Sequence, residues 1–191
     1  MKWFYLIFLT ISLLDANGIQ KSSIKNETGL SSKDTLTIEA KNRALKFLEA
    51  IERLDLDLIS KMISSDGVTL TDFGRFGAMD SDEIHLSKSE FLNAIKNSKK
   101  IIKSYSADEE NRKKLTLKEY LKSLHKSSQS LKSVEIVDDL RGLDSNGDKY
   151  KTAIIWWRGK NHYEDLAMIV ILKKYRSQWF VVALAKECWR I

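Results

Sequence analysis

Apolar and polar residues follow different periods in the two halves of the chain, and the C-terminal half carries the strand pattern. From residue 133 onward, β-prone runs are separated by short turns rich in Asn, Asp, Gly and Ser, a spacing typical of antiparallel neighbours. The pattern predicts a meander of four strands, over Ser133–Leu143, Lys149–Arg158, Tyr163–Lys174 and Trp179–Arg190. Residues 166–172 are apolar at even- and odd-numbered positions alike, which predicts that the third strand is buried on both faces.

Before the meander, apolar residues recur at helical spacing. Asp34 or Thr35 can cap a first helix. The apolar face of this helix consists of Ala40, Ala44, Phe47, Leu48, Ile51 and Leu54. A shorter helix is expected after Asp55, and Val68–Phe73 alternates as a first strand. Phe73–His85, with two glycines, is expected to be a loop.

Two capping boxes begin later helices. In each of them a Ser or Thr precedes a Glu by three residues, so that the two side chains satisfy free N–H groups of the first helical turn. The pairs are Ser87 with Glu90 and Thr116 with Glu119. Helices followed by a run of strands predict an α+β fold, in which the N-terminal helices pack on one face of a mostly antiparallel sheet. We expect this domain to cover residues 34–191.

Residues 1–18 have the organisation of a secretory signal peptide. Lys2 provides the positive n-region, Trp3–Leu14 is an apolar stretch of h-region length, and small residues precede a cleavage site after Gly18. The stretch is too short to span a bilayer comfortably, and its alternative is a buried N-terminal strand or helix. Residues 19–33 are polar and aperiodic, which predicts a flexible lead-in. We therefore expect a secreted or periplasmic protein without a membrane span once the leader is removed.

Composition narrows the class of protein. Hydrophobic residues make up 43% and charged residues 30% of the chain, as in soluble globular proteins. One cysteine, Cys188, excludes an intrachain disulfide. The net charge of +6 is spread over single lysines and short pairs. Such dispersed charge favours a solvated basic surface, and leaves nucleic acid or an anionic membrane surface as the less favoured partners.

Three stretches carry a family resemblance: Ala44–Phe73, Ser87–Ile95 and Gln178–Arg190. They give, in order, a long helix, a short helix, a strand, a capped helix and an aromatic closing strand. This order resembles the nuclear transport factor 2-like superfamily, which includes ketosteroid isomerase-like and SnoaL-like proteins. The resemblance implies a curved, cystatin-like α+β cone with a deep pocket between sheet and helices, and it makes residues 99–130 a helical insertion. It implies no catalytic residue, because the family has no shared catalytic motif that matches this chain.

Strand parity supplies the candidate pocket residues. One face of the last strand is expected to hold Trp179, Val181, Ala183, Ala185, Glu187 and Trp189. The two alanines between bulky residues leave room for a ligand. Glu187 would lie in apolar surroundings, where desolvation raises the pKa of a carboxyl group and suits it to proton transfer. Asp72 is the second acid that can face inward, and Trp156 is the candidate from the second strand of the meander.

Each of these candidates has a plainer alternative. Glu187 can lie at a frayed strand end or in a surface ion pair, and the same holds for Asp72. Trp156 and Trp157 point to opposite faces, and core packing is the commoner role of such a residue.

Other chemical motifs fail on inspection. Asp144, Asn146 and Asp148 look like the start of a calcium loop, but the loop lacks Gly at its sixth position and Glu at its twelfth. The three histidines have no metal-ligand spacing, so we expect no metal site. The sequence has neither a Gly-x-Ser-x-Gly elbow nor a Gly-rich phosphate loop, and we therefore expect no nucleotide cofactor.

Three functions remain open. A binding protein for a small apolar or amphipathic ligand predicts a pocket without paired ionisable groups. An acid–base enzyme, such as an isomerase or dehydratase acting on a small hydrophobic substrate, predicts Glu187 and Asp72 in one cavity. An interaction module predicts an exposed apolar patch on the outer sheet face, used by a homodimer, or a contact through the basic segment 99–132. We favour the first function and leave the question of catalysis open.

Overall fold

The computed structural model describes residues 31–77, 82–97, 99–104, 112–124, 131–143, 149–157 and 166–188. The expectations for the signal peptide, for most of the lead-in, for Trp189 and for the first two turns of the meander lie outside these residues. The elements are α1 (Ser32–Arg53), α2 (Leu56–Met62), β1 (Val68–Thr71), β2 (Ile84–Leu86), α3 (Lys88–Lys96), β3 (Lys100–Lys103), β4 (Lys114–Thr116), α4 (Leu117–Ser123), β5 (Leu131–Val137), β6 (Tyr150–Trp157), β7 (Leu166–Tyr175) and β8 (Gln178–Cys188).

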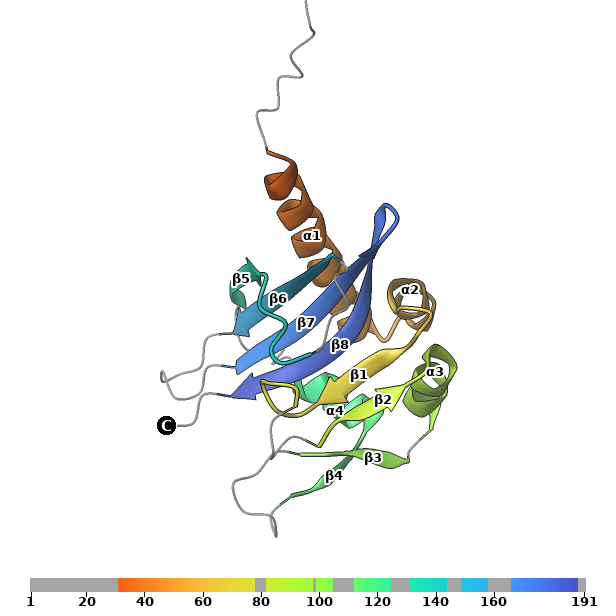
Figure 1. The fold of residues 1–191 in the computed structure, drawn as a ribbon. Helices are drawn as coiled ribbons and strands as arrows, with labels where there is room; N and C mark the ends of the chain where they lie inside the picture. Colours follow the sequence, from red (N-terminus) through yellow and green to blue (C-terminus); the bar gives the residue numbers. More distant parts are fainter. Residues whose placement is uncertain are drawn as a thin grey trace, which may run out of the picture.

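A mixed, mostly antiparallel sheet of six strands forms the framework of the fold (Figure 1). Its strand order is β2-β1-β8-β7-β6-β5, and β1 runs parallel to β8 while the other neighbours are antiparallel. The predicted four-stranded meander is therefore confirmed as β5 to β8. Strands β3 and β4 pair with each other in a separate two-stranded sheet.

Helix α1 lies across one face of the large sheet, where it contacts β5, β6, β7 and β8 (Figure 1). The fully buried side chains of Phe47 from α1, Phe91 from α3, Tyr120 from α4 and Ile155 from β6 fill the space between the helices and the sheet. Residues 166–172 of β7 are buried without exception, as predicted for a strand covered on both faces. The predicted α+β fold class, with helices on a mostly antiparallel sheet, is confirmed.

The N-terminus of α1 differs from its prediction. The helix begins at Ser32, because Ser31 is its N-cap and forms a capping box with Asp34. Asp34 is thus the third residue of the helix and not its cap. The two capping boxes predicted further along the chain, at the starts of α3 and α4, are both confirmed.

Strand boundaries also differ from their predictions. The first strand of the meander ends at Val137 and not at Leu143, because the chain turns where Arg141 (φ 52°) and Gly142 (φ 89°) adopt left-handed backbone conformations. A loop was predicted over Phe73–His85, but its last two residues belong to β2 in the structure. We expected residues 99–130 to form a helical insertion. In the structure, β3 and β4 precede α4 within this segment, so its first part consists of strands.

A bulge in β8 changes which residues share a face. Ile171 pairs with Ala183, but the next residue of β7, Leu172, pairs with Val181. Val182 is therefore an extra residue in β8, and an extra residue inverts the alternation of side chains beyond it. The predicted common face for all the odd-numbered residues of this strand is wrong for that reason.

The two sides of β8 can be assigned from their neighbours. Trp179 and Val181 pack in the core beneath the helices, and so does Leu184. Ala183 and Ala185 pack instead with Phe76, Ile169 and Ile171 in a second apolar cluster on the outer face of the sheet. The bulge thus moves the two alanines away from the helices.

Tyr120 connects α4 to the parallel pair of strands. Its side chain is fully buried, and its hydroxyl lies 2.8 Å from the carbonyl oxygen of Thr71 in β1 and 3.0 Å from that of Leu184 in β8. The hydroxyl can donate its proton to either carbonyl, and burial raises the pKa of Tyr120 well above its ordinary value, so the group stays neutral. This contact joins the helical layer to the place where the first strand meets the meander.

We expect Tyr120→Phe to lower the free energy of unfolding by about 1–2 kcal/mol, because two buried carbonyl groups lose their shared donor while the ring still fills the core. Urea denaturation followed by circular dichroism measures the change. Tyr175→Phe is the matched control, since Tyr175 is 59% exposed. An equal loss in both variants would contradict the proposed anchor.

Candidate functional site

The five candidate pocket residues separate into three places. Trp156, Ala183 and Glu187 lie on the outer face of the sheet, since Trp157 and Leu184 next to them face the helices. Asp72 follows the end of β1 on the helix side, where it pairs with Lys186. Trp179 packs in the core at the other end of β8. The structure thus places three of the candidates on the face away from the helices, outside the expected pocket between sheet and helices, and the other two elsewhere.

Two loops cover Glu187 on the outer face. The Glu187 carboxylate lies 3.3 Å from the Arg141 guanidinium, which belongs to the turn after β5. On the other side lies Gly74, where a Cβ atom would approach the Glu187 side chain to 3.0 Å. Phe76 N–H donates to the Arg141 carbonyl at 2.6 Å and links the two loops. Glu187 is thus held in an ion pair beneath a cover of backbone, and its side chain is only 18% exposed.

Burial raises the pKa of the Glu187 carboxyl, although the nearby Arg141 acts in the opposite direction. The direction of this shift is the one expected from the sequence. A raised pKa by itself does not make an acid catalytic, because the reacting group must also reach it.

Asp72 occupies a different environment. Its side chain is 5% exposed and lies 3.7 Å from the Lys186 ammonium, on the side of the sheet that Leu70 and Leu184 share with the helices. Glu187 projects from the opposite side. The sheet therefore separates the two acids, and each of them has a basic partner of its own.

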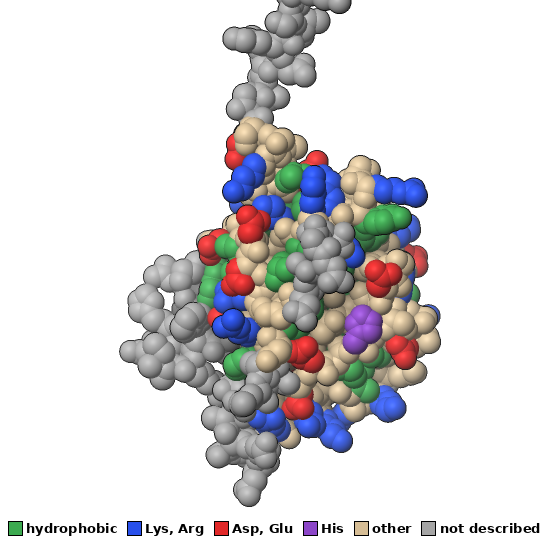
Figure 2. Space-filling view, viewed as in Figure 1, with side chains coloured by type: hydrophobic (Ala, Val, Ile, Leu, Met, Phe, Trp, Pro, Cys, Tyr) green, Lys and Arg blue, Asp and Glu red, His purple; other side chains and the backbone are tan. Residues whose placement is uncertain are grey.

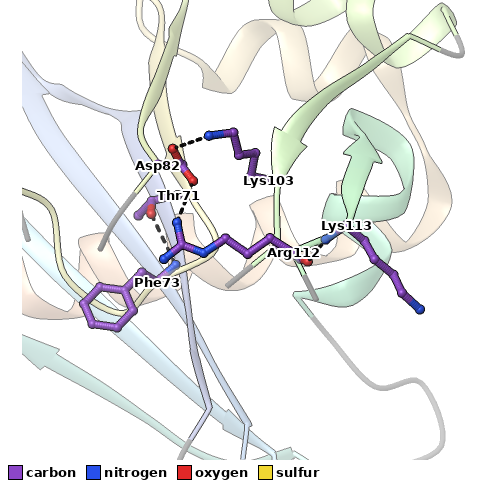
Figure 3. A network of polar contacts seen from close by, with 7 residues as sticks. Thr71, Phe73, Asp82, Lys103, Arg112 and Lys113 are labelled. Carbon is purple, nitrogen blue, oxygen red and sulfur yellow. Dashed lines mark hydrogen bonds and ion pairs between the residues drawn. The ribbon is translucent and has the colours of Figure 1, made fainter. Parts of the chain in front are cut away.

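A polar network surrounds the end of β1 (Figure 3). Asp82 accepts hydrogen bonds from Lys103 at 3.0 Å and from Arg112 at 3.2 Å. Thr71 Oγ1 accepts a hydrogen bond from Phe73 N–H, which turns the chain after β1. The hollow between these side chains, which Asp72 also lines, is too small to hold a water molecule. The network ties the β3–β4 hairpin to the large sheet, and we assign it a structural role.

A larger hollow, of about 370 Å³, lies between the first turns of α1 and the start of β6. This volume is in the range of small-molecule sites. We call it the α1–β6 hollow; its described lining residues are Leu36, Asp138, Leu140, Lys149, Tyr150, Lys151 and Trp179. Trp179 is the one candidate pocket residue that it contains.

Polar contacts hold the Trp179 side chain in place at the edge of the α1–β6 hollow. Glu39 of α1 accepts hydrogen bonds from Trp179 Nε1 at 3.2 Å and from Lys174 at 2.7 Å. The Lys174 ammonium also lies 5.5 Å from the centre of the Trp179 ring. The hydrogen bond from Lys174 is the main reason why the pKa of Glu39 is lowered, so this carboxylate stays ionised and fixes the indole.

The two lysines of the α1–β6 hollow differ in whether a carboxylate pairs with them. Lys151 is buried and forms a short ion pair with Asp138, whose pKa this contact lowers. Lys149 is exposed, and no ion pair joins it to another residue in the part of the chain that the structure describes. The hollow therefore offers aromatic and aliphatic surface beside one lysine that no described carboxylate pairs with.

Sequence reasoning missed several of these residues. Tyr150 and Lys149 follow a turn at the start of a predicted strand, where nothing in the sequence indicates which helix lies opposite. Arg141 was assigned to a strand, although the Gly that follows it is a signal for a turn. The pairing of Glu39 with Trp179 spans 140 residues and has no sequence signal at all.

Comparisons with known proteins add a likeness of fold. No family model and no curated protein matches the chain. Among solved structures, a cystatin-like fold protein from Burkholderia xenovorans covers 82% of this chain and 94% of its own, at 8% identity and a TM-score of 0.45. An NTF2-like family protein from Streptomyces avermitilis covers 82% and 98%, at 11% identity and a TM-score of 0.45. An NTF2-like protein from Pseudomonas putida covers 80% and 86%, at 11% identity and a TM-score of 0.43.

At the level of the fold, these neighbours are the nuclear transport factor 2-like and cystatin-like proteins that the sequence resembles. At such identities and scores the likeness is one of element arrangement, and it carries nothing about ligand, activity or assembly. Within the described residues, no helix is long and apolar enough to cross a membrane, and no three His, Cys, Asp or Glu side chains gather as metal ligands.

Glu187 gives a pH-dependent prediction. Because its pKa is raised in the folded state, its stabilising contribution is present below the ordinary value of 4.5 and is lost as the pH rises through the raised pKa. We expect the melting temperature of Glu187→Gln, relative to that of the original protein, to increase between acidic and neutral pH. Glu135→Gln, at an exposed position of β5, is the control and should show a constant difference. A constant difference for both variants would refute the assignment.

Proposed function

We propose that the mature chain is an exported binding protein that takes a small amphipathic molecule in the α1–β6 hollow. The apolar part of the ligand would lie against Leu36, Tyr150 and Trp179, and its anionic group would face Lys149. The observation that carries this proposal is the unneutralised lysine beside a fixed aromatic lining. Small-molecule sites commonly combine such an apolar lining with few polar groups.

The structure supports a binding role over an acid–base enzyme. The enzyme hypothesis needs Asp72 and Glu187 in one cavity, but the sheet lies between them. Each carboxylate already has a basic partner, Lys186 and Arg141 respectively. Two acids without shared access to a substrate do not provide the separate acid and base of an isomerase or dehydratase.

The structure gives less support to an interaction through the outer sheet face. That hypothesis needs an exposed apolar patch, whereas Ile169, Ile171, Ala183 and Ala185 are fully buried. Among the described residues, the large hydrophobic side chains that are exposed are Ile38 and Tyr175. Ile38 lies on α1, and Tyr175 lies at the end of β7, beyond the buried outer-face cluster.

A fluorescent amphipathic anion, 8-anilinonaphthalene-1-sulfonate, tests the α1–β6 hollow. We expect saturable binding with one site per chain. Tyr150→Ala should weaken it about tenfold through loss of aromatic contact, and Lys149→Glu about five- to tenfold through charge reversal. Lys61→Glu, on the exposed side of α2, is the charge-matched control and should leave the affinity unchanged.

Two outcomes would refute the hollow as the binding site. One is equal affinity in all variants, and the other is binding that appears only when the near-ultraviolet circular dichroism of a variant shows loss of tertiary structure. If the hollow is the site, native mass spectrometry of protein purified from its own host should then detect a co-purifying molecule that Tyr150→Ala fails to retain.

Export is a separate part of the proposal and has its own measurement. The intact mass of the protein from its own host should correspond to residues 19–191, because the leader is expected to be cleaved after Gly18. Cell fractionation should recover this form outside the cytoplasm. A full-length mass in the cytoplasmic fraction would contradict export and would leave the binding proposal untouched.

A further inference from the structure

The β3–β4 hairpin and α4 carry a concentration of lysines that neither the core nor the α1–β6 hollow uses. Residues 99–104 and 112–124 hold eight basic side chains and one acidic side chain, Glu119. Residues 108–110, in the chain between them, add three acidic side chains. Basic side chains gather at the end of the molecule that bears this hairpin (Figures 1 and 2). The net charge of the whole segment is therefore clearly positive.

Most of these cations have no ion-pair partner among the residues that the structure describes. Asp82 engages Lys103 and Arg112 in the network of Figure 3. The other six are exposed, and no ion pair joins any of them to a residue that the structure describes. They are Lys99, Lys100, Lys113, Lys114, Lys118 and Lys122, and we call them the hairpin lysines.

The arrangement of these lysines works against the stability of the hairpin. Lys103 and Lys114 are directly opposite each other in the pairing of β3 with β4. Like charges at opposed positions destabilise a strand pair, and among the described residues a carboxylate, Asp82, lies beside Lys103 but none lies beside Lys114. Thr116 hydrogen bonds lower the pKa of Glu119, with a further contribution from Lys100, so this acid is already used as the helix cap. A surface that keeps such repulsion is better explained by an external anionic partner than by folding.

We propose that the hairpin lysines dock the protein on the surface of an anionic lipid bilayer. The free cations are all lysines, whose mobile ammonium groups suit a diffuse layer of charge. Lysine is depleted in protein–protein interfaces, and the described residues of the hairpin present no exposed aromatic side chain on which single-stranded nucleic acid would stack. A fluid layer of headgroups can move to meet each lysine, so the proposed docking rests on charge.

Vesicle sedimentation tests this surface. We expect the protein to bind vesicles of phosphatidylcholine mixed with phosphatidylglycerol and not vesicles of phosphatidylcholine alone. Binding should disappear as salt shortens the Debye length from about 10 Å to about 3 Å. The double variant Lys114→Glu, Lys118→Glu should partition at least about tenfold more weakly.

The double variant Lys41→Glu, Lys46→Glu is the matched control, because it changes the net charge equally on the exposed side of α1. It should keep more than half of the binding, and circular dichroism should show both variants to be folded. Equal losses in the two variants would overturn the proposal, since net charge alone would then explain the attraction. Equal binding to neutral vesicles, or tighter binding to a single-stranded oligonucleotide at the same salt concentration, would overturn it as well.

Discussion

The antiparallel pairing of β7 with β8 holds the rest of the structure in register. β7 is buried on both faces, so it cannot shift by one residue without exposing apolar side chains to water or placing them against the wrong layer. Within this pair, the bulge at Val182 decides which residues of β8 face the helices. Leu184 then lies on the helix side, where its carbonyl meets Tyr120, and the two alanines lie on the outer side beneath Phe76.

The side of the sheet that each β8 residue faces determines which polar groups it meets. Small alanine side chains on the outer face let the loop with Gly74 and Phe76 approach closely, and that loop covers Glu187. The same alternation sends Lys186 to the helix side, where it meets Asp72. Two acids that a regular strand would have brought to one pocket are thus separated by the thickness of the sheet. The interior is used for packing, and the features that suit a partner lie at the two ends of the molecule.

The α1–β6 hollow and the hairpin lysines are different kinds of surface. The α1–β6 hollow combines aromatic surface with an exposed lysine, Lys149, and under our proposal it would select a small amphipathic molecule by shape and by charge. The hairpin lysines form an exposed array of cations, which suits a broad anionic surface. Neither feature depends on the other, because the hairpin is joined to the sheet through the Asp82 network, far along the chain from the lining of the hollow.

Much of the fold followed from local signals in the sequence. The capping boxes of Ser87 and Thr116, the doubly apolar run in β7 and the order of the meander each depend on residues close together in the chain, and each is found in the structure. The candidate site did not follow in this way. Ala183 and Glu187 share a face as parity predicts, but it is the face away from the helices and not the expected pocket side, and the extra residue in β8 places Trp179 on the other side. Only tertiary structure could decide this, because a bulge and contacts such as Glu39 with Trp179 arise from packing between distant segments, which leaves no period in the sequence.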